Sequence, residues 1–104
     1  MSDGQAAANP GRLWYLYVLH CRGGSLYTGI TTDVAKRYAA HAAGKGARYT
    51  RSFPPLSIAL VLQFDGKGDA LAAEHAVKAM SAAQKRAWLA AQTQEADSSA
   101  GNGR

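Results

Sequence analysis

Residues 13–31, LWYLYVLHCRGGSLYTGIT, decide the fold of this 104-residue chain. The first run, 13–21, is rich in aromatic and β-branched residues, and 26–31 has the same character. Between them lies Arg-Gly-Gly-Ser at 22–25, which has the composition of a tight turn. Two apolar runs joined by a Gly-Gly turn predict a β-hairpin.

A helix is expected directly after this hairpin. Thr31, Thr32 and Asp33 can each cap its first turn, and the helical pattern continues to about residue 43. The residues that follow, 45–51, are basic and predict a loop or a single helical turn.

The next stretch predicts a third strand and a second long helix. Pro54 and Pro55 exclude a helix at that point and lead into an apolar strand over 56–64. After a short turn, Asp69 can cap a helix that continues to about residue 80.

The chain then predicts a last helix. Ser81 and Gln84 have the spacing of a capping box, and Trp88 and Leu89 would face inward from the helix that it starts. The expected order is therefore β-β-α-β-α-α. This order predicts an α+β fold, with a three-stranded antiparallel sheet flanked by helices.

The two ends of the chain differ from its middle. Residues 1–11 and 94–104 are small and polar without apolar periodicity, so they predict flexible tails around a single domain over 12–93. No secretory signal and no apolar run of about 20 residues is apparent. Cys21 is the sole cysteine, which excludes an internal disulfide. These features predict a cytoplasmic protein that does not enter membranes.

The charge of the expected domain is strongly positive. Residues 12–93 hold eleven Lys or Arg against four acids, a net charge of +7. The stretch 36–51 has five basic residues and no acid. Such a field favours a polyanion such as nucleic acid, although charge that serves only solubility would account for the composition equally well.

Several polar residues do not fit a purely structural pattern. Arg37 and His41 are four residues apart and share one helix face, an arrangement that in isolation also fits an ordinary solvated face. Tyr17 lies in the first strand, and Tyr27 opens the second. Gly29 follows closely and indicates a close backbone approach or a bulge.

One carboxylate is also unusual. Glu74 is an acid of the expected domain that lies neither in a turn nor at an expected helix cap. With Lys78 four residues later it could form an ordinary exposed ion pair. A basic domain that acts on phosphate, however, needs a ligand for a divalent cation, and a carboxylate is the usual one. Both interpretations remain open for Glu74.

From Trp14 to about Leu89 the chain resembles the GIY-YIG nuclease superfamily, and above all its small stand-alone bacterial members. The resemblance rests on several matches in one order and spacing: Tyr15-Leu16-Tyr17, Tyr27-Thr28-Gly29, Lys36-Arg37, His41, the stretch 44–51 and Glu74.

This resemblance implies a metal-dependent DNA endonuclease. Glu74 would hold one Mg²⁺ or Mn²⁺, and Arg37 would contact the phosphate. Tyr17 and Tyr27 would orient or deprotonate the attacking water, and His41 would relay the proton. The residues expected to contact nucleic acid are Lys36, Lys45, Arg48, Tyr49, Arg51 and Lys78.

The chain also departs from the family pattern. No Asn occurs between residues 10 and 101, although many larger members have a late active-site Asn, and no room is left for an added DNA-binding domain. The expected enzyme is therefore structure-selective or weakly sequence-specific, acting on branched or damaged DNA in repair or processing. The alternative is a non-catalytic module that binds DNA or RNA, in which Tyr49 and Phe53 would stack on bases.

Overall fold

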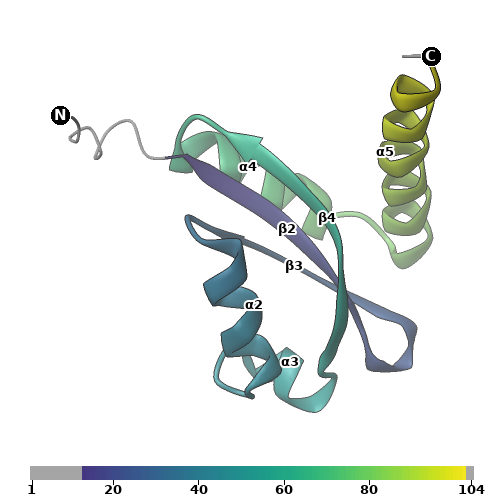
Figure 1. The fold of residues 1–104 in the computed structure, drawn as a ribbon. Coiled ribbons are helices and arrows are strands. Elements are labelled where there is room, and N and C mark those ends of the chain that lie inside the picture. Colours follow the sequence, from purple (N-terminus) through teal and green to yellow (C-terminus); the bar gives the residue numbers. More distant parts are fainter. Residues whose placement is uncertain (1–12, 103–104) are drawn as a thin grey trace, which may run out of the picture.

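The structure is a computed structural model that describes residues 13–102, with side chains described up to residue 93. The expected N-terminal tail, residues 1–11, lies outside the described residues. The elements are β2 (Trp14–Cys21), a 3-10 turn η1 (Arg22–Gly24), β3 (Ser25–Thr31), α2 (Val34–Ala42), α3 (Arg48–Ser52), β4 (Pro55–Phe64), α4 (Lys67–Lys78) and α5 (Ala82–Asn102) (Figure 1).

The strands form one antiparallel sheet in the order β3-β2-β4, which confirms the predicted α+β fold. The predicted hairpin is β2 and β3, and its register places Tyr17 opposite Gly29. The central strand β2 pairs on its other side with β4. Within the described residues, β3 is therefore an edge strand.

The alternation of side chains along β2 separates two packed layers. Leu16 and Val18 face a cluster that contains Val77 of α4, with Met80 and Trp88 packed against it. The alternate residues Tyr17, Leu19 and Cys21 face the opposite side of the sheet. Val34 and Tyr38 of α2 pack against this second cluster. The sheet thus has helices on both faces, with α2 on one side and α4 on the other (Figure 1).

The local signals at two helix starts are confirmed. Of the three candidate caps before α2, the side chain of Asp33 accepts a hydrogen bond from the Lys36 amide at 3.0 Å. Ser81 and Gln84 form the predicted capping box, with reciprocal hydrogen bonds of 2.8 and 3.1 Å. Leu89 is buried and Trp88 half-buried, as expected for the inner face of α5.

The predicted cap at Asp69 is wrong. Helix α4 begins earlier, at Lys67, because the Gly66 carbonyl already accepts a hydrogen bond from the Ala70 amide at 3.3 Å. Asp69 instead lies in the first turn, where its negative charge interacts favourably with the helix dipole.

Helix α5 also extends beyond the expected domain limit at residue 93 and ends at Asn102. The first added residues, Gln94, Glu95 and Ala96, favour helix and continue the preceding turns without an apolar stripe. Among residues 13–102, no helix is long and apolar enough to cross a lipid bilayer.

Candidate active site

The centre of the candidate site is a buried hydrogen bond between a strand and a helix. The hydroxyl of Tyr17, on β2, lies 2.9 Å from Nε2 of His41, on α2. Tyr17 is 2% exposed and His41 is fully buried. A buried pair of two ionisable groups is costly unless each is hydrogen-bonded, and this bond satisfies both.

Gly29 makes room for the Tyr17 side chain. A Cβ atom at this position would lie 2.5 Å from the Tyr17 hydroxyl oxygen and 2.7 Å from Cζ. The phenol therefore extends directly over the backbone of β3. This confirms the close backbone approach expected at Gly29, whereas the alternative, a bulge, is absent from the regular β2–β3 register of the described hairpin.

Aromatic rings connect this buried centre to the surface. The ring of Tyr27 lies 5.0 Å from that of His41 and 6.3 Å from that of Tyr17, measured between centroids. On its other side Tyr27 stacks with Tyr49, at 5.9 Å and an interplanar angle of 25°. Tyr49 in turn contacts Phe53 at 5.2 Å, and both of these rings are exposed.

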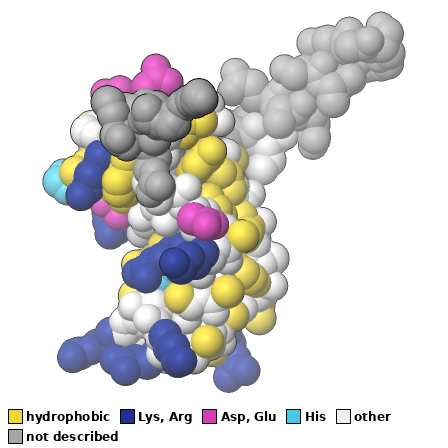
Figure 2. Space-filling model, turned by 60° about the vertical axis from the view of Figure 1, so that its left-hand side comes forward, with side chains coloured by type: hydrophobic (Ala, Val, Ile, Leu, Met, Phe, Trp, Pro, Cys, Tyr) yellow, Lys and Arg dark blue, Asp and Glu magenta, His cyan; other side chains and the backbone are white. Residues whose placement is uncertain are grey.

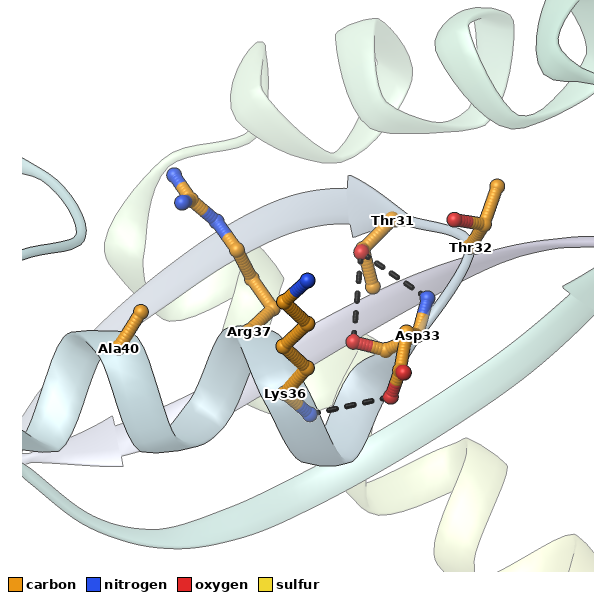
Figure 3. A pocket seen from close by; sticks show the side chains of 6 residues that line it. All are labelled: Thr31, Thr32, Asp33, Lys36, Arg37 and Ala40. Atoms are coloured by element: carbon orange, nitrogen blue, oxygen red, sulfur yellow. Dashed lines mark hydrogen bonds between the residues drawn. The ribbon is translucent and has the colours of Figure 1, made fainter.

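Arg37 adds a positive charge to the centre. Its side chain acts to lower the pKa of the Tyr17 hydroxyl, through hydrogen bonding and through its charge. Arg37 also lines an open pocket of about 460 Å³ together with Lys36, Thr31 and Asp33. Figure 3 shows the side chains of Lys36 and Arg37 rising from α2 in the same direction, beside the Thr31–Asp33 hydrogen bonds that begin the helix. Two cations therefore lie beside one pocket next to Tyr17.

Burial dominates the electrostatics of the central pair. It raises the pKa of the Tyr17 hydroxyl, against the opposing effect of the Arg37 hydrogen bond and charge. It lowers the pKa of His41, and the positive charge of Arg37 acts in the same direction. At neutral pH the site therefore holds a protonated phenol beside a neutral imidazole, the arrangement in which His41 can accept a proton.

Glu74 approaches this centre from the other face of the sheet. It lies on α4, its side chain is 14% exposed, and its negative charge contributes to the raised pKa of Tyr17. Its Oε2 atom forms an ion pair with Nζ of Lys78 at 3.2 Å. No group of three or more His, Cys, Asp or Glu side chains suited to a metal occurs within the described residues. A cation here would have a single carboxylate ligand, which suits Mg²⁺ because it keeps most of its waters.

A groove wraps around the edge of β3. It measures about 220 Å³ and is lined by Leu26, Tyr27, Thr28, Tyr49, Lys78 and Lys85. Its lining includes Tyr49 of α3 and Lys78 of α4, so the groove borders elements from both faces of the sheet. The pattern of the sequence did not indicate Lys85, because only the packing of α5 brings it beside the hairpin.

The remaining predicted nucleic-acid contacts form a separate group. Lys45, Arg48 and Arg51 are exposed and line a pocket of about 170 Å³ around the loop that precedes α3. Figure 2 shows Lys and Arg side chains gathered at the lower end of the molecule, which is the end where α3 lies in Figure 1. Cations therefore lie beside the site at Lys36, at Lys78 and around this loop.

Two residues of the stretch 44–51, to which the sequence assigned no individual role, hold His41 in place. Its second ring nitrogen, Nδ1, lies 2.7 Å from the hydroxyl of Thr50, which is fully buried. Gly46 packs flat against the ring, because a Cβ atom there would lie 2.7 Å from Cγ and Cε1 of His41. Both lie in the basic stretch after α2. This stretch has no repeating apolar pattern of a helix or a strand from which its contacts with His41 could be predicted.

The chain is similar to known proteins over most of its described length. Residues 13–87 match the family model of the GIY-YIG catalytic domain. A UPF0213 protein of Cupriavidus pinatubonensis is 61% identical over 79 residues, which cover 76% of this chain and 88% of the relative. A UPF0213 protein of Neisseria meningitidis is 48% identical over 73 residues, covering 70% and 80%. The solution NMR structure of a UPF0213 protein from Bacillus halodurans is similar with a TM-score of 0.51 and 41% identity, covering 75% and 83%.

Proposed function

Because this chain belongs to the GIY-YIG catalytic domain family, a nuclease superfamily, we propose that it is a metal-dependent endonuclease that hydrolyses phosphodiester bonds in DNA. The observation that carries the proposal is the buried Tyr17–His41 hydrogen bond. Arg37 acts to lower the pKa of the same hydroxyl, and the charge of Glu74 acts to raise it. A hydroxyl held between a cation and a neutral imidazole is arranged for proton transfer at a phosphate.

The proton path follows from the two pKa shifts. The raised pKa of Tyr17 means that its hydroxyl is protonated at neutral pH and cannot act as a base alone. It can take a proton from water when its own proton moves to Nε2 of His41, which is neutral because its pKa is lowered. Arg37 would hold the phosphate and stabilise the negative charge that builds up during attack. Tyr27, in contact with the His41 ring, would help to orient the water.

Glu74 is the residue that would hold the cation, which we propose is Mg²⁺ or Mn²⁺. When bound, such an ion supplies positive charge to the phosphate and to the leaving oxygen. The carboxylate chemistry fits, with the remaining positions left to water and a phosphate oxygen. Lys78, whose side chain is 50% exposed, can release Glu74 and turn to the nucleic-acid backbone.

The surface around the site supports a weakly sequence-specific substrate. Lys36, Lys78 and the basic pocket around Lys45, Arg48 and Arg51 would contact phosphates, and such contacts position a nucleic acid without reading its bases. The exposed rings of Tyr49 and Phe53 would stack on an unpaired base. We therefore propose branched or damaged DNA as the substrate, cut during repair or processing in the cytoplasm.

A cleavage assay with one substitution tests the metal role. We expect the wild-type protein with Mg²⁺ or Mn²⁺ to nick supercoiled DNA, and Glu74→Gln to reduce nicking at least 10²-fold because it removes the anionic ligand. EDTA should abolish wild-type nicking. Asp69→Asn is the matched control, since it removes an exposed carboxylate from the first turn of the same helix. Nicking by Glu74→Gln at the wild-type rate, with circular dichroism unchanged, would sink the proposal.

A second candidate function is a non-catalytic module that binds DNA or RNA. It is favoured by the Glu74–Lys78 ion pair, which occupies the carboxylate, and by the exposed Tyr49–Phe53 pair. Competition between duplex DNA, branched DNA and structured RNA at fixed salt separates the two candidates. Tight binding that persists in EDTA, without cleavage of any of these substrates with metal, would favour the binding module.

A further inference from the structure

The hydroxyl of Thr50 has three neighbours. It lies 2.7 Å from Nδ1 of His41, 3.2 Å from the amide nitrogen of Ala47 and 3.0 Å from the carbonyl oxygen of the same residue. Thr50 is fully buried, so no solvent molecule is needed to account for these contacts. The arrangement therefore limits where each proton can be.

The hydroxyl has one proton to donate. The Ala47 amide can only donate, and the Ala47 carbonyl can only accept. This carbonyl also accepts from the Arg51 amide at 3.2 Å, and the Thr50 hydroxyl, at 3.0 Å, supplies the shorter of its two bonds. The oxygen of Thr50 then faces Nδ1 as an acceptor. With the Thr50 proton on that carbonyl, Nδ1 of His41 carries the hydrogen of the 2.7 Å bond.

The other end of the His41 ring gives the same answer independently. The phenol proton of Tyr17 needs an acceptor within the protein, because the side chain is buried. Nε2 of His41 is 2.9 Å away and can accept that proton only if it carries no hydrogen itself. Were Nε2 protonated, the Tyr17 proton would lack an acceptor among the hydrogen bonds found in residues 13–93.

We propose that Thr50 is a positioning residue that fixes His41 in the Nδ1–H tautomer and thereby keeps Nε2 open to the proton of Tyr17. The catalytic meaning of this role rests on the proposed nuclease function, whereas the tautomer itself does not. During the reaction Nε2 gains the phenol proton and the imidazolium keeps its Nδ1–H bond to Thr50. Tyr17 takes the proton of the attacking water at the same time. When Tyr17 passes that proton to solvent water, which protonates the leaving oxygen, Nε2 returns its own proton to Tyr17, and only water and the substrate are consumed.

The backbone around Thr50 supports this role. The α3 turn fixes Thr50 through its own bonds to Ala47, and Gly46 lets the preceding loop lie against the face of the imidazole. The ring is thus restrained in its plane by Thr50 and Tyr17 and across its plane by Gly46. A neutral imidazole in this place is consistent with its lowered pKa, caused by burial and by Arg37.

NMR of the ring nitrogens tests the tautomer without any activity. In ¹⁵N-labelled wild-type protein at neutral pH, we expect His41 to show a protonated Nδ1 and an unprotonated Nε2. Thr50→Val, which keeps the shape and removes the hydroxyl, should shift the population toward the Nε2–H form. Thr50→Ser should restore the wild-type pattern, because it keeps the hydroxyl. A protonated Nε2 in the wild type, or an unchanged tautomer in Thr50→Val, overturns the proposal.

Kinetics test the role in catalysis. With wild-type protein that cleaves, Thr50→Val should lower kcat by roughly 10²-fold with KM for DNA unchanged, the size of an impaired proton transfer, and Thr50→Ser should retain activity. An unchanged kcat in folded Thr50→Val overturns the catalytic role. If the wild type cleaves nothing, the nuclease proposal fails, and the ring nitrogens of wild type and Thr50→Val still decide whether Thr50 sets the tautomer. If Thr50→Val does not fold, Thr50→Ala, which also lacks the hydroxyl, takes its place, and a protonated Nε2 in the wild type still overturns the proposal.

Discussion

At the scale of single residues, the site depends on where a side chain is missing as much as on the reactive groups. Gly29 leaves the space over which the Tyr17 phenol reaches His41, and Gly46 leaves the space beside the imidazole. Protein interiors are close-packed, so an added methyl group in such a place displaces its neighbour. The position of the Tyr17 hydroxyl, on β2, therefore depends in part on a glycine of the neighbouring strand β3.

Replacing Gly29 tests this dependence. We expect Gly29→Ala to lower the free energy of unfolding by about 1–3 kcal/mol, the usual cost of overpacking, and to abolish nicking because Tyr17 is pushed off His41. Urea denaturation and the nicking assay measure the two effects.

Gly68 provides the matched control for this substitution. It lies in α4 with no heavy atom within 4 Å of an added Cβ. Gly68→Ala should therefore raise stability by about 0.5–1 kcal/mol and leave nicking unchanged. Wild-type stability and activity in Gly29→Ala would contradict the assigned position of Tyr17.

Single residues also show how far sequence reasoning extends. Arg37 and His41 could be predicted to share a helix face from their spacing alone, and Gly29 could be predicted as a close approach from its place in a strand. Thr50 and Gly46 could not, because their contacts with His41 pass through an irregular loop without any period. Only the closed tertiary structure shows that they pack on the ring.

At the scale of elements, α2 is the part that delivers two charged or ionisable groups to one strand. Asp33 caps this helix by accepting from the Lys36 amide, and Arg37 and His41 follow within two turns. Side-chain caps satisfy amides that the first turn leaves without a partner. The orientation of the helix that carries the site therefore begins at this cap.

Removing the cap should weaken the whole domain measurably. Asp33→Ala is expected to lower the free energy of unfolding by about 1 kcal/mol, the typical cost of losing an N-cap acceptor. Asp33→Asn keeps an acceptor oxygen and is expected to stay within a few tenths of a kcal/mol of wild type. Urea denaturation at constant pH and salt measures both values. Equal losses in the two variants would show that the carboxylate charge, and not the cap, matters.

Elements with their own local signals were predictable, and those defined by tertiary packing were less so. The hairpin, β4 and the capping box of α5 follow from turn residues, apolar runs and a four-residue motif. The predicted start of α4 at Asp69 was wrong, because the Gly66 carbonyl accepts the first helical hydrogen bond without any side-chain cap. The length of α5 was underestimated because helix propensity needs no apolar face.

At the scale of the whole molecule, charge is distributed unevenly around one site. Exposed cations lie around the loop before α3, in the pocket beside Arg37 and along the groove at the β3 edge. Contacts between such cations and phosphates release counterions, so affinity for DNA decreases with salt in proportion to the number of contacts. The number of phosphate contacts can therefore be obtained from the salt dependence of the affinity.

A salt titration of DNA binding counts the contacts of the basic loop. Replacing Lys45, Arg48 and Arg51 by Gln should weaken binding to duplex DNA in EDTA and reduce the slope of log affinity against log salt by up to about 0.9 per lost phosphate contact. Fluorescence anisotropy over a series of salt concentrations measures the slope.

Lys67→Gln is the control for this measurement. Lys67 lies over the ring of Trp14, at the end of β2 away from the hairpin. Its substitution should leave the slope at the wild-type value. A triple variant with the wild-type slope would show that the nucleic acid does not follow this loop.

The groove that wraps around β3 has a consequence for engineering. It is lined by both Tyr27 and Lys78, and β3 is an edge strand within the described residues, so a strand added to that edge would cover the groove beside the proposed active site. The opposite edge, β4, carries none of the site residues. Fused modules, designed dimers and crystallisation partners are therefore compatible with an open site when they attach along β4, whereas a peptide that extends the sheet at β3 would act as a plug.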